Sequence, residues 1–200
     1  MVIGIAGKYC SGKNFVSGIV KNYRYNGFGF TVVDVDIIGH TVLERKRGEV
    51  ISAFGDSITD GTGRIDRKKL GRIVFRSRVK KSELESLLHP LMVEEVKEGI
   101  KGRRENTIIN AAILFDMGLH ELCDFVICVY APFWVRFIRA LKRDNLSIGD
   151  TLKRLSAQKR ICSKSGGSKV DIYSVRNAGK TEDVQRDVSG ILTKKGLTKG

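Results

Sequence analysis

Residues 7–14 have the types and spacing of a phosphate-binding loop. They fit the pattern G-x-x-x-x-G-K and read Gly7-Lys8-Tyr9-Cys10-Ser11-Gly12-Lys13-Asn14. The glycines allow the backbone to curl so that successive N–H groups point inward, and a helix that follows presents its positive N-terminal end there. Because Lys13 adds a full positive charge, we expect residues 7–14 and the adjoining Phe15 to bind the phosphates of ATP.

Asn14 stands where this pattern normally has serine or threonine, whose hydroxyl binds Mg²⁺. The side-chain oxygen of asparagine is also a hard donor, so we expect Asn14 to bind Mg²⁺ directly or through water. The alternative is a glycine-rich turn that contains a lysine by chance. An apolar run before the loop and a helical pattern after it favour phosphate binding.

Two aspartates, Asp34 and Asp36, close the second apolar run of the chain. Ligands of open parallel sheets bind at the carboxyl ends of the strands, so we expect both side chains near the loop. Two residues apart on an extended chain, they point the same way, and one would accept a proton from a substrate hydroxyl while the other holds Mg²⁺. Asp116, at the predicted end of the third strand, is a second candidate metal ligand. Alternatively, Asp34 and Asp36 are solvated loop acids, or cap a helix that begins near Ile37.

A basic stretch runs from Arg139 to Lys169 and contains nine lysines and arginines but only two acidic residues. Arg139 and Arg143 are four residues apart, which places them on one face of a helix. An arginine that closes over a transferring phosphoryl group stabilises its developing charge, and we expect Arg139 to do this. For most of the other residues, a solvated basic face is the better interpretation.

Two histidines are candidate substrate-binding residues. His40 lies one helical turn after Asp36, and His89 precedes Pro90 on an amphipathic segment. A hydrogen-bonded histidine with a purely structural role is the alternative for both.

Apolar runs and helical patterns alternate along the chain and predict the elements that position these residues. Strands are predicted over residues 2–6, 28–35, 107–115, 125–131 and 170–175. Helices are predicted over residues 13–25, 37–54 with an interruption at Gly48, 66–75, 82–91, 133–143, 147–160 and 181–192, with caps at Asp66, Ser82 and Ser147. Residues 163–168 are a predicted loop, and residues 193–200 a frayed tail. The nearly continuous apolar strands indicate an α/β fold whose parallel sheet is covered on both faces.

The 200 residues carry a formal charge of +14, and 42% of them are hydrophobic. This ordinary globular composition excludes wholesale disorder and collagen-like structure. The charge favours polyanionic partners such as nucleic acid, anionic lipid or phosphate-rich small molecules. Since there is neither a signal-peptide pattern nor an apolar run long enough to span a bilayer, we predict a cytoplasmic protein with no membrane partner.

Several further segments occur in an order that is specific to one family. They are Val32–Ile38, Asp60–Leu70, Leu84–Leu91, Ile113–Asp116 and the residues Arg139, Arg143 and Gln158. Together with the loop, this set resembles the dephospho-CoA kinase family over about residues 1 to 180. The chain departs from the family pattern at Asn14, at Ala112 and Asp116 in place of proline and glutamate, and in the loop over residues 163–168.

The resemblance implies a P-loop kinase of the nucleoside-monophosphate-kinase type, in one domain over residues 1–200 with about five parallel strands. The core would comprise about residues 1–36, 106–135 and 170–200, with a helical substrate-binding insertion over about 37–105 and a basic lid over about 136–169. It also implies transfer of the γ-phosphate of ATP to the ribose 3′-hydroxyl of dephospho-CoA, the last step of coenzyme A biosynthesis, with ATP and Mg²⁺ as cofactors. In this reaction Lys13 would hold phosphates, Asp36 would be the base and Arg139 the lid arginine.

Two other functions remain open at this point. One is a P-loop kinase for another acceptor, such as a nucleoside or a nucleoside monophosphate. The other is a non-catalytic nucleotide- or RNA-binding protein, which Asn14 and the positive charge favour, although the sequence has no RNA-recognition signature. We expect a monomer or weak homo-oligomer with no specific nucleic-acid partner.

Overall fold

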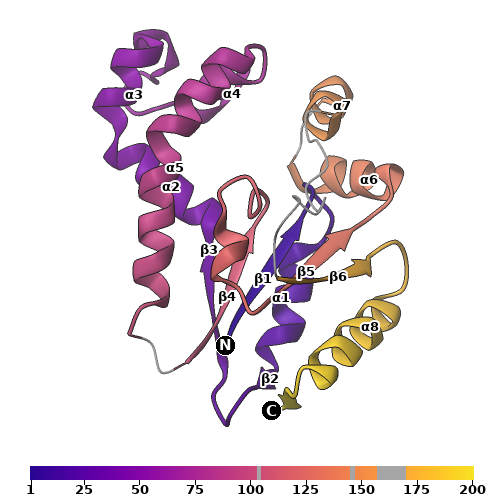
Figure 1. Cartoon of the computed structure of the whole chain (residues 1–200). Coiled ribbons are helices and arrows are strands. Elements are labelled where there is room, and N and C mark those ends of the chain that lie inside the picture. Colours follow the sequence, from indigo (N-terminus) through magenta and orange to yellow (C-terminus); the bar gives the residue numbers. More distant parts are fainter. Residues whose placement is uncertain (103–104, 145–146, 157–169) are drawn as a thin grey trace. The chain divides into compact units, whose positions relative to one another are not determined.

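The computed structural model describes residues 1–102, 105–144, 147–156 and 170–200. Within these ranges the chain divides into two units, which Figure 1 traces from the N-terminus to the C-terminus. The sheet unit contains Met1–Asp34 and Ile100–Gly200, and the helical unit contains Val35–Gly99. No helix in the described ranges is long and apolar enough to cross a membrane.

Five parallel strands form the central sheet of the sheet unit (Figure 1), which confirms the predicted α/β fold. They are β1 (Val2–Gly7), β3 (Phe30–Asp34), β4 (Asn106–Ala111), β5 (Phe125–Tyr130) and β6 (Asp171–Arg176). Their order across the sheet is β3-β4-β1-β5-β6, and the register places Asp34 and Ile5 on either side of Asn110. Because the strands run the same way, their carboxyl ends meet at one edge of the sheet.

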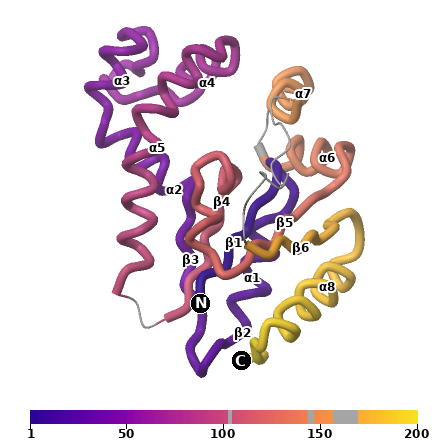
Figure 2. Tube along the Cα trace, viewed as in Figure 1, coloured from indigo at the N-terminus to yellow at the C-terminus, as the bar shows by residue number. Residues whose placement is uncertain are grey.

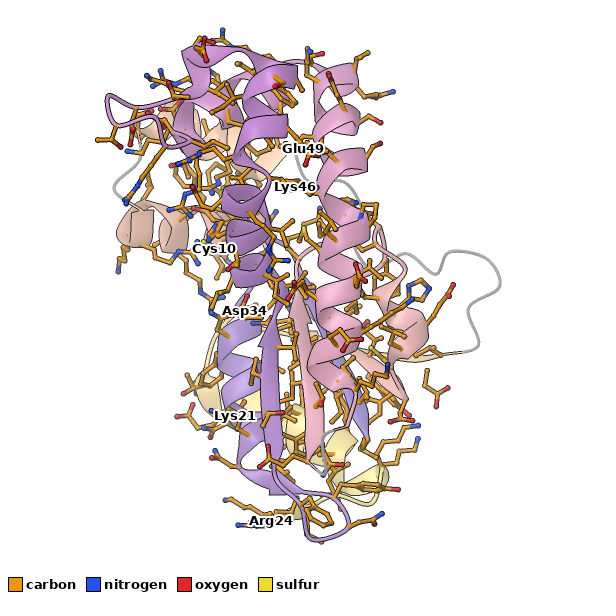
Figure 3. All side chains as sticks on the ribbon, turned by 90° about the vertical axis from the view of Figure 1, so that its left-hand side faces the viewer. Cys10, Lys21, Arg24, Asp34, Lys46 and Glu49 are labelled. Carbon is orange, nitrogen blue, oxygen red and sulfur yellow. The ribbon has the colours of Figure 1, made fainter. Side chains whose placement is uncertain are left out.

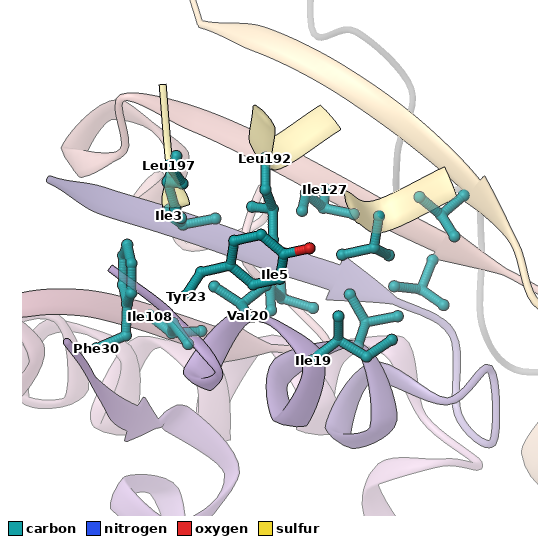
Figure 4. Packing of buried hydrophobic residues seen from close by; sticks show 14 of the residues in the cluster. Ile3, Ile5, Ile19, Val20, Tyr23, Phe30, Ile108, Ile127, Leu192 and Leu197 are labelled. Atoms are coloured by element: carbon teal, nitrogen blue, oxygen red, sulfur yellow. The ribbon is translucent and has the colours of Figure 1, made fainter. Parts of the chain in front are cut away.

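Helices α1 (Lys13–Lys21) and α8 (Thr181–Lys194) lie side by side against the sheet (Figure 2). Figure 4 shows Ile3 and Ile5 of β1 packed among Val20 of α1 and Leu192 of α8. Burying a side chain of this size stabilises the fold by about 1.5–3 kcal/mol. The packing therefore anchors the strand before the phosphate loop and the helix after it.

The C-terminal residues are held in place, and the predicted frayed tail is wrong. Strand β7 (Thr198–Lys199) pairs antiparallel with β2 (Tyr23–Arg24), and the backbone N–H of Gly200 donates to the carbonyl of Asn22 at 2.8 Å. Leu197 is only 3% exposed. The pairing explains why α1 ends at Lys21, before the predicted boundary, and Figure 2 shows the C-terminus beside β2.

The segments after β4 and β5 follow the prediction in part. β4 ends at Ala111, and turns lead from it to the short helix η2 (Leu119–Leu122), so the predicted strand over residues 107–115 is too long. Helices α6 (Phe133–Asp144) and α7 (Ile148–Ser156) occur where expected. The Ser147 hydroxyl accepts from the backbone N–H of Asp150 at 3.1 Å, which confirms the predicted cap. The predicted end of this helix and the predicted loop over residues 163–168 lie outside the described residues.

The helical unit consists of successive helices and turns. They are α2 (Val35–Arg45), α3 (Arg47–Phe54), η1 (Asp56–Ile58), α4 (Arg67–Val74) and α5 (Arg78–Ile100). The break between the first two helices lies at Lys46, not at Gly48. Helix α2 packs on α5, since a Cβ added to Gly39 would approach Met92 to 3.1 Å, and Arg45 forms an ion pair with Glu95 at 2.6 Å.

Asp66 and Ser82 were predicted to cap helices of this unit, and the structure confirms one of the two. Asp66 caps α4 as expected, and its carboxylate accepts from the backbone N–H groups of Lys68 and Lys69. The prediction that Ser82 starts a helix is wrong, because α5 has already begun at Arg78. The cap is Ser77, whose hydroxyl accepts from the backbone N–H of Lys80 at 3.2 Å.

Candidate functional site

The segment between β1 and α1 has the bent backbone that a phosphate-binding loop needs. The N–H of Ser11 donates to the carbonyl of Lys8 at 2.9 Å and closes a turn. Cys10 and Gly12 both have positive φ values, of 58° and 97°, and Gly12 is the N-cap residue of α1. α1 follows the bend directly, and the N-terminal end of a helix favours an anion beside it.

Both glycines of the loop occupy positions that exclude a side chain. A Cβ at Gly7 would collide with the carbonyl oxygen of Val129 on β5. A Cβ at Gly12 would overlap the side-chain amide of Asn177. The G-x-x-x-x-G spacing is therefore required by contacts with two other segments of the sheet unit as well as by the loop's own conformation.

Asn177, directly after β6, links the loop to Arg139 of α6. Its side-chain N–H donates to the carbonyl of Ser11 at 2.9 Å. Its side-chain oxygen accepts from Arg139 Nη2 at 2.9 Å, and its backbone carbonyl accepts from Arg139 Nη1 at 3.2 Å. The structure thus places Arg139 against the loop. The sequence analysis missed Asn177, although a polar residue at the carboxyl end of the last strand was an available signal.

Asn14, Asn110 and Asp34 come together at the carboxyl ends of β3 and β4. The side-chain N–H of Asn110 donates to Asn14 Oδ1 at 2.9 Å and lies 3.5 Å from Asp34 Oδ2. Asn110 is 3% exposed, and among the described residues its side-chain oxygen has no hydrogen-bond partner. Figure 3 shows Asp34 and Cys10 at one end of the sheet unit, away from Lys21 and Arg24.

The oxygens of Asn14 and Asp34 suit a hard cation. An amide oxygen and a carboxylate are the donor type that Mg²⁺ prefers, whereas Asn110 directs its side-chain N–H toward this pair and its own oxygen away from it. The described ranges contain no cluster of three or more histidine, cysteine, aspartate or glutamate side chains that could hold a metal. The sequence analysis missed Asn110, whose only signal was a polar side chain inside an apolar strand.

Asp36 does not lie on the extended strand where it was expected. β3 ends at Asp34 and α2 begins at Val35, so the prediction that the two carboxylates point the same way from one extended segment is wrong. Asp36 is exposed in the first turn of α2, where its charge also favours the N-terminal end of the helix. The β-branched Val35 extended the predicted strand, yet it is buried as part of the helix.

The remaining candidates lie in the turns after β4, on α2, on α5 and at the start of α1. Asp116 is exposed in the turns between β4 and η2, so it does not end a strand as predicted. His40 is exposed on α2, and His89 is half-buried on α5, so both belong to the helical unit. Phe15 is exposed in the first turn of α1, beside the loop.

Positive charge surrounds the loop. Burial raises the pKa of the Cys10 thiol, and four cationic side chains oppose that rise, namely Arg143, Arg154, Lys13 and Arg136. Burial, together with the nearby Arg136, lowers the pKa of the Lys8 ammonium group. A group of cations that repel one another is stabilised by a bound polyanion, so the field at this loop suits a polyphosphate.

Tyr9 joins the loop to α6 and α7. The Arg143 guanidinium lies 4.9 Å from the centre of the Tyr9 ring, and that of Arg154 lies 4.6 Å from it. Through these cation–π contacts, two arginines of the basic stretch that begins at Arg139 lie against the phosphate loop.

Comparison with known proteins finds relatives along the whole chain. The family model for dephospho-CoA kinase matches residues 1–183. A dephospho-CoA kinase of Bacillus licheniformis is 30% identical over 199 residues, which cover 96% of this chain and 95% of the relative. A dephospho-CoA kinase of Fusobacterium nucleatum is 32% identical over 195 residues, covering 94% of this chain and 95% of the relative.

Solved structures share the fold. A crystal structure of a Thermus thermophilus protein superimposes with a TM-score of 0.76 at 26% identity, covering 97% of both chains. The dephospho-CoA kinase of Campylobacter jejuni superimposes with a TM-score of 0.64 at 24% identity, covering 98% of both chains. The second likeness bears on the fold alone, and both agree with the predicted fold class.

Proposed function

The chain belongs to the dephospho-CoA kinase family and acts as a dephospho-CoA kinase, and we propose that its phosphate loop, Arg139 and the carboxylates of Asp34 and Asp36 carry out the reaction. The reaction moves the γ-phosphate of ATP to the ribose 3′-hydroxyl of dephospho-CoA and gives CoA and ADP, the last step of coenzyme A biosynthesis. Its transition state needs alignment of donor and acceptor and neutralisation of charge more than covalent chemistry from the protein.

ATP binding falls to the loop between β1 and α1. The inward amides, the N-terminal end of α1 and the Lys13 ammonium group would bind the β- and γ-phosphates. Arg139, held beside Ser11 by Asn177, would stabilise the charge on the phosphoryl group in flight. The remaining loop residues, from Lys8 to Ser11, and Phe15 would line the nucleotide site.

Acceptor activation is assigned to Asp34, the last residue of β3, and to Asp36 in the first turn of α2. Asp36 would accept the proton of the attacking 3′-hydroxyl as general base, and Asp34 would help to orient the acceptor. Asp36 is exposed and lies two residues after the end of β3, so it is accessible to a substrate. His40 and His89, on the helical unit, are proposed to contact dephospho-CoA.

A Mg²⁺ ion fits the oxygen atoms of Asn14 and Asp34, which both lie near the side-chain N–H of Asn110. Bound there, it would neutralise charge on the phosphates of ATP. Asn110 orients the side chain of Asn14, so the amide takes the place of the usual hydroxyl at the loop's exit. Asp36 and Asp116 remain further candidates for the metal, directly or through water.

The observation that carries this proposal is the strand–loop–helix bend with two side-chain-excluding glycines, tied to Arg139 through Asn177. The test is an ADP-release assay with purified protein, Mg²⁺-ATP and a panel of acceptors: dephospho-CoA, adenosine and AMP. We expect turnover with dephospho-CoA and little with the others. Equal turnover across the panel, or none, would overturn the proposed substrate.

A further inference from the structure

Arg136 is a buried arginine at the start of the predicted lid, and no individual role has been assigned to it so far. It is 5% exposed, and its Nε and Nη1 atoms are buried without a hydrogen-bond partner among the described residues. Buried arginine side chains are normally paired with a carboxylate or fully hydrogen-bonded, because the guanidinium stays charged. Among the described residues, neither of these two atoms has an acceptor within hydrogen-bond distance.

The position of Arg136 on α6 directs it to the phosphate loop. Residues at spacings of three, four and seven lie on one face of a helix, so Arg136 shares a face with Arg139 and Arg143. Arg139 donates to Asn177 beside the loop, and Arg143 lies over the ring of Tyr9 in the loop. The third arginine of this face thus points the same way.

The electrostatic contacts of Arg136 agree with this direction. Burial and, after it, the charge of Arg136 lower the pKa of the Lys8 ammonium group, and Arg136 is one of four cations that oppose the burial-raised pKa of the Cys10 thiol. Burial in turn lowers the pKa of Arg136 itself, and the Cys10 side chain partly opposes this effect. Two residues of the loop therefore lie within electrostatic reach of the guanidinium.

A purely structural role accounts poorly for this burial. The guanidinium lies 5.9 Å from the centre of the Phe133 ring, at the outer limit of a cation–π contact. Such a contact does not satisfy the N–H groups in the plane of the guanidinium, which need oxygen acceptors. A phosphate supplies these acceptors together with opposite charge.

We propose that Arg136 is an additional phosphate-binding residue of the ATP site, whose guanidinium binds a non-bridging oxygen of the polyphosphate beside Lys8 and Cys10. This inference rests on the proposed function, since it uses the same loop. It adds a third cation to Lys13 and Arg139. It also explains why an unpaired charge is buried at this place, because ATP completes its hydrogen bonds.

The test compares Arg136→Met with Lys142→Met. Both variants remove one positive charge from α6, but Lys142 is exposed and has no place in the site. Calorimetry measures the Kd of Mg²⁺-ATP and of adenosine, which has no phosphate, and thermal unfolding measures the Tm of the free protein. We expect Arg136→Met to weaken ATP binding by about 10- to 100-fold, the range of a hydrogen bond to a charged group, and to leave adenosine binding within about twofold. Lys142→Met should change the Kd of ATP and the Kd of adenosine by less than about threefold, because the interaction energy of an exposed charge is small.

The Tm separates ligand binding from structural support. Replacing an unpaired buried charge by an apolar side chain of similar volume leaves a protein as stable or more stable, so the Tm of free Arg136→Met should equal or exceed that of the wild type. If this variant does not fold, Arg136→Gln replaces it with the same expectation for ATP and adenosine. An unchanged ATP affinity, or an equal loss for ATP and adenosine, would overturn the inference.

ATP binding by the wild type separates failure of the proposed function from failure of the role proposed for Arg136. If the wild type fails to bind Mg²⁺-ATP, the proposed function itself fails. If the wild type binds ATP and Arg136→Met binds it equally well, the kinase assignment stands and only the role of Arg136 is lost. Competition of inorganic pyrophosphate with ATP in the wild type, weakened in Arg136→Met, would support the phosphate contact directly.

Discussion

The side-chain N–H of Asn110 donates to the side-chain oxygen of Asn14 at 2.9 Å and ties the end of β4 to the start of α1. The contact joins residues far apart in the sequence. It orients the amide that stands where phosphate loops usually carry a hydroxyl, and it leaves the buried oxygen of Asn110 without a donor in the described part of the chain.

This contact predicts how the enzyme responds to Mg²⁺. Asn110→Ala should raise the Mg²⁺ concentration for half-maximal activity by about tenfold, the value of one hydrogen bond, because Asn14 loses its orientation. Asn14→Ala should have a similar effect. Since both substitutions remove the same contact, the Mg²⁺ concentration for half-maximal activity of the double variant should be close to that of either single variant. Fully additive shifts in a Mg²⁺ titration would show that the two side chains act independently.

The assignment of Asp36 as general base predicts a specific kinetic change. Asp36→Asn should lower kcat by about 10²-fold or more, the range of general-base catalysis, and leave the Kd of ATP nearly unchanged. Glu44→Gln, on the same helix, is the control for removing a negative charge. Unchanged turnover in Asp36→Asn would remove Asp36 from the mechanism.

The tight packing at Gly12 predicts a difference between two glycines with positive φ. Gly12→Ala and Gly27→Ala both place alanine in a left-handed conformation, at φ values of 97° and 81°, which costs about 1 kcal/mol of unfolding free energy. Only Gly12→Ala also collides with Asn177, whereas a Cβ at Gly27 meets open space. Urea unfolding should therefore show a larger loss for Gly12→Ala, accompanied by loss of ATP binding. Equal losses with ATP binding retained would contradict the close approach of Asn177.

Asp66 predicts a pH-dependent contribution to the stability of the helical unit. The backbone N–H of Lys69 and, more weakly, that of Lys68 hold the pKa of the Asp66 carboxyl below its ordinary value of about 3.9. A lowered folded-state pKa means that the stabilisation is fully present above about pH 3.9 and is lost as the pH falls through the folded value. Asp66→Ala should lower the Tm at pH 7, and the difference from wild type should shrink on acidification.

Thermal unfolding followed by circular dichroism between pH 7 and pH 2 measures this effect. Asp66→Asn keeps a capping side chain without the charge, so its difference from wild type should be smaller at pH 7. A difference between Asp66→Ala and the wild type that stays constant down to the lowest pH would contradict the role of the carboxylate.

Local patterns were sufficient for the parts of the fold that depend on neighbouring residues. The phosphate loop follows from the spacing of Gly7, Gly12 and Lys13, and the central strands β1, β4 and β5 follow from apolar runs that are buried on both faces. Asp66 and Ser147 were found because a cap bonds to residues only two or three positions away.

Contacts between distant segments were not predictable in the same way. Asn110, Asn177 and Arg136 reach the loop only after the sheet and α6 are formed, and a single polar residue in a strand or helix has no periodic signal. The ends of β3 and of the chain were misplaced for a related reason. The β-branched Val35 is typical of a strand but lies in a helix here, so it does not mark the end of β3. The C-terminal β7 pairs with β2, which is far away in the sequence. The cytoplasmic location and the monomeric or weakly associating state stay predictions.

The transfer of labelled phosphate tests the central claim most directly. Wild type, Lys13→Ala and the exposed-lysine control Lys21→Ala are incubated with γ-labelled ATP, Mg²⁺ and dephospho-CoA, and the labelled product is identified by mass spectrometry. If the phosphate loop is the donor site, wild type and Lys21→Ala should place the label on the ribose 3′-oxygen of CoA. The rate of transfer should fall by at least about 10²-fold in Lys13→Ala, because this variant lacks the positive charge that binds the β- and γ-phosphates. Label found only in inorganic phosphate, or transfer that persists in Lys13→Ala, would contradict it.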